Sequence, residues 1–209
     1  SGAWDQADGN LTVVLGSGLA ANTTYVVSFN LTNPRAEQAS PAVSVGATIE
    51  AGRVDAGVVA RGMTKLHAVR RGVANGTDPL LVLEPRFTVL AIEQSSPIWM
   101  VENTMTVSLV TNCEFAAGSA VTISGLTGSD TADGSVGVSS EFASSGAWDQ
   151  ADGNLTVVLG SGLAANTTYV VSFNLTNPRA EQASPAVSVG ATIEAVSYTH
   201  LRAHETRHD

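Results

Sequence analysis

The chain has 209 residues, of which 44% are hydrophobic and only 14% are charged, and its formal net charge is -9. The length suits one large or two small domains with a buried core. An acidic chain with one lysine, Lys65, lacks the basic face that nucleic acid or an anionic membrane surface requires. No apolar run is long enough to insert into a membrane. These features favour a solvated extracellular or cell-surface protein.

A long exact repeat sets the expected domain organisation. Residues 1–51 recur letter for letter as residues 145–195. The period suits one β-sandwich of about 100 residues plus a connector, and it is too long for a solenoid. The identity reflects either a recent tandem duplication or an assembly error that joined one repeat to itself. We expect the back half of an immunoglobulin-like repeat at 1–51, a connector at 52–85 and a complete sandwich at 86–195.

The first 85 residues are predicted to form a partial module. A hairpin should follow Trp4, a strand should contain Tyr25, and a last strand should end the first repeat copy. Without front strands, this half-module would expose its inward side chains, which are Leu11, Val13, Tyr25, Val27 and Phe29. In the connector, apolar runs at 54–60 and 80–83 could add strands, and residues 63–71 could form a short helix.

The complete module shows period-two alternation of apolar and polar residues almost throughout. Strands are predicted over 86–94, 103–111, 120–126, 134–140, 147–150, 154–159, 167–176 and 186–193. Asp152-Gly153 is a hairpin signal because both residues tolerate positive φ. We therefore expect an all-β chain: an antiparallel two-sheet sandwich with one complete and one partial module.

The stretch LAANTTYVVSFNL, residues 163–175, resembles the corner before the sixth strand of fibronectin type III domains. The resemblance implies a tyrosine corner, in which Tyr169 bonds through its hydroxyl to an upstream backbone group, and likewise Tyr25 in the first copy. The chain departs from that family at Leu109, where tryptophan is usual, and at Ala165, where proline is usual. The phrases SPAVSV and ISGLTGS also resemble very long tandem-repeat surface proteins, which implies architecture and no chemistry.

Asparagine residues supply the most frequent candidate sites. Seven of the eleven begin an N-x-Thr sequon: Asn10, Asn22, Asn30, Asn75, Asn154, Asn166 and Asn174. The predicted register places Asn30 and Asn174 on outward faces and Asn22 and Asn166 in turns, where a glycan would not enter the core. The competing interpretation is that Asn and Thr are simply abundant in turns and on strand surfaces.

Other polar and aromatic residues have structural interpretations beside functional ones. Four aspartates, Asp130, Asp133, Asp149 and Asp152, could hold Ca²⁺ if they met at one end, but D-x-x-D-G is also ordinary turn chemistry. The tryptophans are Trp4, Trp99 and Trp148. We expect Trp99 and Trp148 to pack, whereas a solvent-facing tryptophan would indicate carbohydrate stacking. Cys113 is alone and is expected to be a buried or half-buried thiol rather than a nucleophile.

The segment 196–209 contains H-E-x-x-H at His204, Glu205 and His208, with His200 at the same spacing before it. On a buried helix this motif binds zinc for hydrolysis. The surrounding residues lack the apolar face of such a helix. Residues 196–206 instead resemble the translation of a sequencing-library adapter. We therefore expect a non-native, irregular tail and an undetermined natural C-terminus.

No catalytic grouping, metal site or cofactor loop is predicted from the sequence. We expect no enzyme activity but a structural or adhesive repeat module of a large extracellular or cell-surface protein. Its partners would be neighbouring repeats, glycans or other surface proteins. The alternative is a carbohydrate-binding module, and the remote alternative is a zinc hydrolase that uses the terminal motif.

Overall fold

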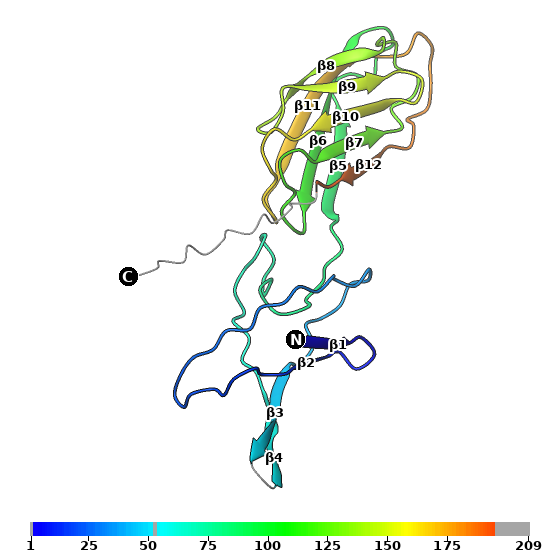
Figure 1. The fold of residues 1–209 in the computed structure, drawn as a ribbon. Helices are drawn as coiled ribbons and strands as arrows, with labels where there is room; N and C mark the ends of the chain where they lie inside the picture. The colour runs from blue at the N-terminus through cyan, green and yellow to red at the C-terminus, as the bar shows by residue number, and fades with distance from the viewer. Residues whose placement is uncertain (1, 52–53, 195–209) are drawn as a thin grey trace. The chain divides into compact units, whose positions relative to one another are not determined.

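The computed structural model describes residues 2–51 and 54–194, and these are all-β with no helix (Figure 1). The chain divides into two compact units, one that ends at Asn33 and one that begins at Pro34. Every strand pair in the described residues is antiparallel. The terminal histidine motif lies outside the described residues.

The first unit contains the predicted hairpin but not the predicted strand around Tyr25. Strand β1 (Gly2–Asp5) pairs with β2 (Asn10–Val13). Residues 23–32 form no strand, although residues 167–176 carry the same letters and mostly do. A strand requires a hydrogen-bonded neighbour, and in this unit the segment has none. The predicted exposure is confirmed for Val13, Tyr25, Val27 and Phe29, while Leu11 is half-buried.

The connector contains one of its two predicted strands and no helix. Strand β3 (Ser44–Ala51) pairs with β4 (Val54–Gly62), which covers the predicted run 54–60. The run 80–83 makes only an isolated bridge, between Val82 and Gln38.

The predicted helix over 63–71 is wrong. His67 and Arg71 have φ values of 53° and 52°, which a right-handed helix does not allow. Buried Asp78 fixes this turn by accepting hydrogen bonds from the His67 backbone N–H and by contacting His67 Nδ1 at 2.8 Å.

The module at 86–194 contains all eight predicted strands. They are β5 (Phe87–Gln94), β6 (Glu102–Thr111), β7 (Ala120–Ser124), β8 (Gly134–Ser139), β9 (Ser145–Asp149), β10 (Asn154–Val158), β11 (Tyr169–Thr176) and β12 (Ser188–Thr192). They form one nearly closed sheet in the order β12-β7-β10-β9-β8-β11-β6-β5. Strands β5 and β12 are its two edges (Figure 1).

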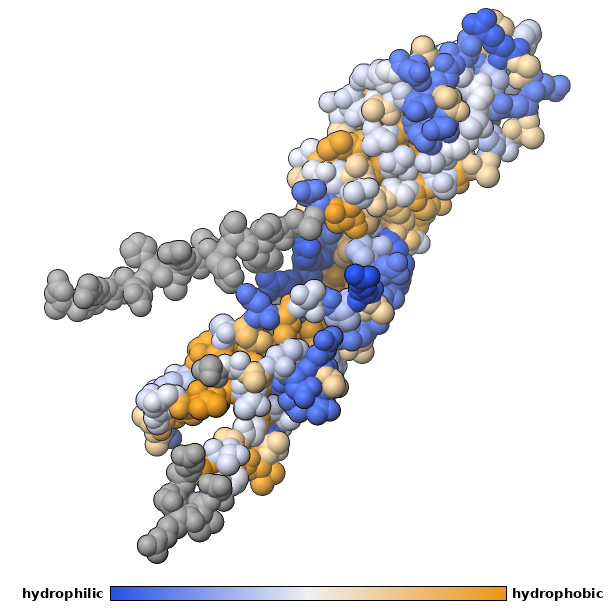
Figure 2. Space-filling view, turned by 45° about the vertical axis from the view of Figure 1, so that its right-hand side comes forward, coloured by the Kyte–Doolittle hydropathy of each residue, from blue (hydrophilic) through white to orange (hydrophobic). Residues whose placement is uncertain are grey.

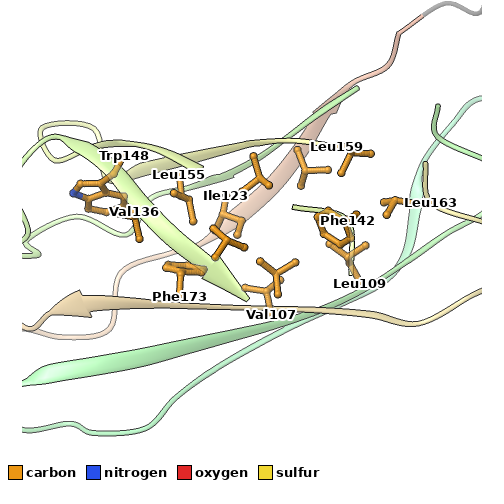
Figure 3. Packing of buried hydrophobic residues seen from close by; sticks show 14 of the residues in the cluster. Val107, Leu109, Ile123, Val136, Phe142, Trp148, Leu155, Leu159, Leu163 and Phe173 are labelled. Atoms are coloured by element: carbon orange, nitrogen blue, oxygen red, sulfur yellow. The ribbon is translucent and has the colours of Figure 1, made fainter. Parts of the chain in front are cut away.

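The core lies inside this nearly closed sheet, where alternate side chains meet (Figure 3). The fully buried apolar residues include Val107, Leu109, Ile123, Leu155, Leu163 and Phe173. The period-two pattern predicted for β6, β7 and β11 thus corresponds to one buried face in each strand. In β12 the same pattern is less fully covered, because Val189 is half-buried and Ala191 is exposed. Each large apolar side chain that is fully buried contributes about 1.5–3 kcal/mol, so burial holds the module together without a disulfide.

The hairpin between β9 and β10 forms, but only Gly153 uses positive φ, at 65°. Asp149 Oδ1 accepts a hydrogen bond from the Asp152 backbone N–H at 3.1 Å and closes the turn. A Cβ on Gly153 would lie 2.5 Å from the backbone of Leu126 and Thr127. Glycine is therefore required here for both conformation and space.

Candidate binding surface at the Trp99 loop

A short loop at residues 95–101, which we call the Trp99 loop, joins β5 to β6 and presents apolar side chains to solvent. Ile98, Trp99 and Met100 are 55%, 62% and 54% exposed. The expectation that Trp99 packs in the interior is therefore wrong. Trp148, in contrast, is buried as expected, and its indole N–H donates to Thr131 O at 2.9 Å.

A buried asparagine holds the first part of this loop. Asn103, at the start of β6, is fully buried. Its Oδ1 accepts hydrogen bonds from the backbone N–H groups of Ser95 and Ser96, both at 3.0 Å. Its Nδ2 donates to Gln94 Oε1 at 2.9 Å and to Asn177 Oδ1 at 2.7 Å. One side chain thus links the end of β5, the loop and the segment after β11.

Asn177 holds the second part. Its Nδ2 donates to Ser96 O at 2.9 Å and to Ile98 O at 2.7 Å, and its own backbone N–H donates to Val101 O. The Met100 N–H donates to Pro178 O at 3.1 Å, and Met100 adopts φ 59°. Positive φ is unfavourable for a non-glycine residue, so these hydrogen bonds are needed to hold the backbone in this conformation. The apolar tip is held in place rather than left loose.

A groove of about 760 Å³ lies between the Trp99 loop and residues 178–187. Its lining combines Trp99 with polar groups that include Glu93, Gln94, Glu181 and Gln182. Arg179 also lines it, but its Nε donates to Asp130 Oδ1 at 2.9 Å. This hydrogen bond lowers the pKa of Asp130 and engages the guanidinium. The groove therefore offers hydroxyls, amides and carboxylates together with this paired guanidinium.

Sequence reasoning missed this surface, although a signal was present. Four large apolar residues in succession, 98–101, follow Pro97 and break the period-two pattern that an inward-facing strand start would keep. The partner of Asn103 could not be found in this way, because Asn177 lies 74 positions later.

The glycosylation sequons lie mainly on exposed backbone. Asn10, Asn22, Asn30, Asn75, Asn166 and Asn174 are exposed, and Asn154 is half-buried. Asn22 and Asn166 sit in turns with φ values of 57° and 56°, as expected, and Asn174 lies on the outer face of β11. Six of the seven positions are thus accessible to a modifying enzyme.

The tyrosine corner implied by the fibronectin resemblance is present in both repeat copies. The Tyr169 hydroxyl oxygen accepts a hydrogen bond from the Ala164 N–H at 2.8 Å, and Tyr25 accepts one from the Ala20 N–H at 2.9 Å. The hydroxyl bond thus forms in both copies, although Tyr25 is 49% exposed.

Three of the four aspartates of the suggested calcium site accept hydrogen bonds from other groups of the module. Asp133 Oδ1 accepts from the Gln150 N–H, Asp149 Oδ1 accepts from the Asp152 N–H, and Asp130 binds Arg179. Within the described ranges, no group of three or more potential metal-ligating side chains is found.

Cys113 is buried, and burial raises the pKa of its thiol, which opposes formation of the reactive thiolate. Among the described residues, the nearby charge of Arg71 lowers this pKa by less than burial raises it.

Comparison with protein-family models, with curated proteins and with solved structures gave no match. In the part of the chain that the structure describes, no helix is long and apolar enough to span a membrane.

Proposed function

We propose that residues 86–194 form a non-catalytic structural or adhesive module of an extracellular or cell-surface repeat protein. The Trp99 loop is the observation that supports adhesion. The buried side chains of Asn103 and Asn177 fix the loop so that its apolar tip, residues 98–100, is exposed to water. In the isolated module these exposed apolar side chains contribute no hydrophobic stabilisation. A partner that covered these three side chains would gain the hydrophobic free energy of burying them.

A second candidate is carbohydrate binding in the groove beside Trp99. An indole face suits the apolar face of a sugar ring, and Glu181 offers a carboxylate in the same groove. Gln94 adds its Nε2 and Gln182 its Oε1, since Gln94 Oε1 already accepts from Asn103 and Gln182 Nε2 already donates to Thr127 O. Since Arg179 is engaged by Asp130 while Glu93 and Glu181 add negative charge, a neutral saccharide fits better than an acidic one.

For the fold, we propose a two-sheet sandwich whose strand order is closer to a jelly roll than to an immunoglobulin domain. In the immunoglobulin arrangement the tyrosine-corner strand lies between the third and the last strands. Here β11 lies between β6 and β8, and β12 pairs with β7. Jelly rolls include lectin domains, which is compatible with saccharide binding but does not by itself imply it.

Alanine substitutions in the loop separate the two candidates. The chain would be immobilised and tested against neutral oligosaccharides and against extracellular-matrix or cell-surface protein preparations. If a saccharide stacks on the indole, Trp99→Ala abolishes glycan binding, while Met100→Ala retains most of it. If a protein surface covers the whole tip, Ile98→Ala and Met100→Ala weaken adhesion about as much as Trp99→Ala.

The control is Val170→Ala, which removes an exposed valine from the outer face of β11, away from the groove lining. Adhesion that is unchanged in all three loop variants would refute a role for this surface.

A further inference from the structure

Strand β5 is an edge of the sheet with little protection against the addition of a further strand. Among the described strands it pairs only with β6. Its single charged residue is Glu93, and it contains neither lysine nor proline, which commonly block an edge. A bulge between Phe87 and Val89 interrupts the pairing at one end, and residues 89–94 form a regular ladder. Such an edge is open to β-strand addition.

The register of β5 identifies the backbone groups that it leaves free. In an antiparallel ladder, residues whose N–H and C=O bond to the neighbouring strand alternate with residues whose groups point away from it. The Ser95 N–H donates to Thr104 O at 3.0 Å, in the register of the β5–β6 pairing. The odd-numbered residues of the ladder therefore bond to β6. The N–H and C=O groups of Leu90 and Ile92 point towards the free edge.

The side chains of the same two residues lie on the inner face of the sheet but are not covered. Leu90 is opposite Leu109 and Ile92 is opposite Val107, and both of these partners are fully buried. Leu90 and Ile92 are nevertheless 46% and 40% exposed. Figure 2 shows apolar residues at the surface of the module among mostly polar ones. A strand that placed apolar side chains beside Leu90 and Ile92 would extend the core.

The module that presents this edge is strongly acidic. Residues 86–194 contain two arginines and ten acidic residues, which gives a formal net charge of -8. Both arginines already form ion pairs at 2.9 Å, Arg86 with Glu37 and Arg179 with Asp130. The module therefore carries an excess of negative charge, which attracts a cationic partner.

This negative charge reaches the end of β5 at the Trp99 groove. Glu93 and Glu181 both line the groove, and within the described ranges neither has an ion-pair partner. Trp99 lines the same groove and is exposed, and the face of an indole ring attracts cations. A lysine or arginine side chain that entered the groove would find two carboxylates and an aromatic ring.

We propose that β5 and the Trp99 groove together bind an extended basic polypeptide segment, which adds to the sheet as an antiparallel strand. Neighbouring residues of a strand point to opposite faces, so the segment alternates in character. Its apolar side chains extend the inner face beside Leu90 and Ile92, and its basic side chains lie on the outer face with Glu93. The proposal rests on the adhesive function proposed above and names the chemistry of the partner.

Synthetic peptides as long as β5, which has 8 residues, test the proposal on the intact chain by isothermal titration calorimetry. The probe alternates valine and lysine, and its matched control alternates valine and glutamate. The lysine peptide should bind and the glutamate peptide should not. Glu93→Gln combined with Glu181→Gln should weaken binding of the lysine peptide about 3- to 10-fold, through lost charge pairing.

N-methylated peptides separate strand addition from simple charge attraction. In the proposed pairing, the valines lie opposite Leu90 and Ile92 and direct their N–H groups to β5, whereas the lysine N–H groups point away. Methylating the valine nitrogens should abolish binding, and methylating the lysine nitrogens should leave most of it.

A substitution in the protein makes the same distinction. Ile92→Pro removes one free-edge N–H without removing a bond to β6, and it should weaken binding of the lysine peptide about tenfold. Val170→Ala, on the outer face of β11, is the control and should bind as the wild type does.

Equal binding of the two methylated peptides, or of the lysine and glutamate peptides, would overturn the proposal even if Ile92→Pro failed to fold. If the lysine peptide does not bind while the loop variants still lose adhesion, strand addition is refuted and the adhesive role stands. If the lysine peptide binds as expected while adhesion is unchanged in the loop variants, only the adhesive role is refuted.

Discussion

Replacing Asn103 by alanine should destabilise the module strongly, because this side chain is the centre of a buried polar network. The substitution removes hydrogen bonds to Ser95, Ser96, Gln94 and Asn177. Water can reach the partners near the surface, but Asn177 Oδ1 is left buried without its donor. An unsatisfied buried polar group costs about 1–3 kcal/mol, and the loop bonds add to this, so we expect a loss of about 3 kcal/mol. For a domain of this size the melting temperature would fall by about 10 °C or more.

The measurement is a urea titration followed by Trp148 fluorescence, in a background in which Trp4 and Trp99 are replaced by phenylalanine. Hydrogen exchange at Ser96 would report on the loop itself, whereas the Ser95 N–H also donates to Thr104 O. Thr104→Ala is the matched control, since it removes one exposed side-chain bond to Asn174 from the neighbouring position. If Asn103→Ala costs no more than this control and the Ser96 amide stays protected, the loop is not held by the asparagine pair.

Three further predictions concern the thiol, the ion pair and the sequons. Cys113 should react with a thiol reagent far more slowly in the native chain than in urea, because burial raises its pKa; equal rates would contradict its buried position. The pKa of Asp130 is depressed, so its pair with Arg179 is present above the ordinary value of 3.8 and is lost as pH falls through the folded pKa. Hydrogen exchange in 178–187 should therefore increase in acid in the wild type, while Asp130→Asn should show no such step. After secretion from eukaryotic cells, glycosidase treatment should shift the mass of the chain, and Asn174→Gln should reduce the shift by one glycan; an unchanged shift would show that Asn174 carries none.

The sequence predicted local structure well because local structure depends on neighbouring residues. The alternation in β6 and β11 reflects one buried face, and the corner at Tyr169 involves residues five positions apart. The order of the strands could not be predicted in this way. Nothing in the letters of β11 specifies β8 rather than β7 as its neighbour, because many apolar faces are mutually compatible.

The failures in the partial module have the same origin. Residues 23–32 carry a perfect strand pattern but have no hydrogen-bonding neighbour, so the pattern alone produces no strand. The helical pattern of 63–71 is overridden by the buried carboxylate of Asp78, which fixes His67 in a left-handed conformation. Trp99 is exposed because Asn103 and Asn177 direct the backbone outward before β6 begins. In each case a distant partner decides the outcome.

The order of the strands along the chain has a consequence for biosynthesis. Strand β6 pairs with β11, and β7 pairs with β12, so residues 86–144 cannot complete their sheet until residues 169–192 have been made. At about 5–20 residues per second, translating residues 145–192 takes several seconds, which is long compared with strand association. During that interval the apolar faces of β6 and β7 wait for the strands of the same module that cover them.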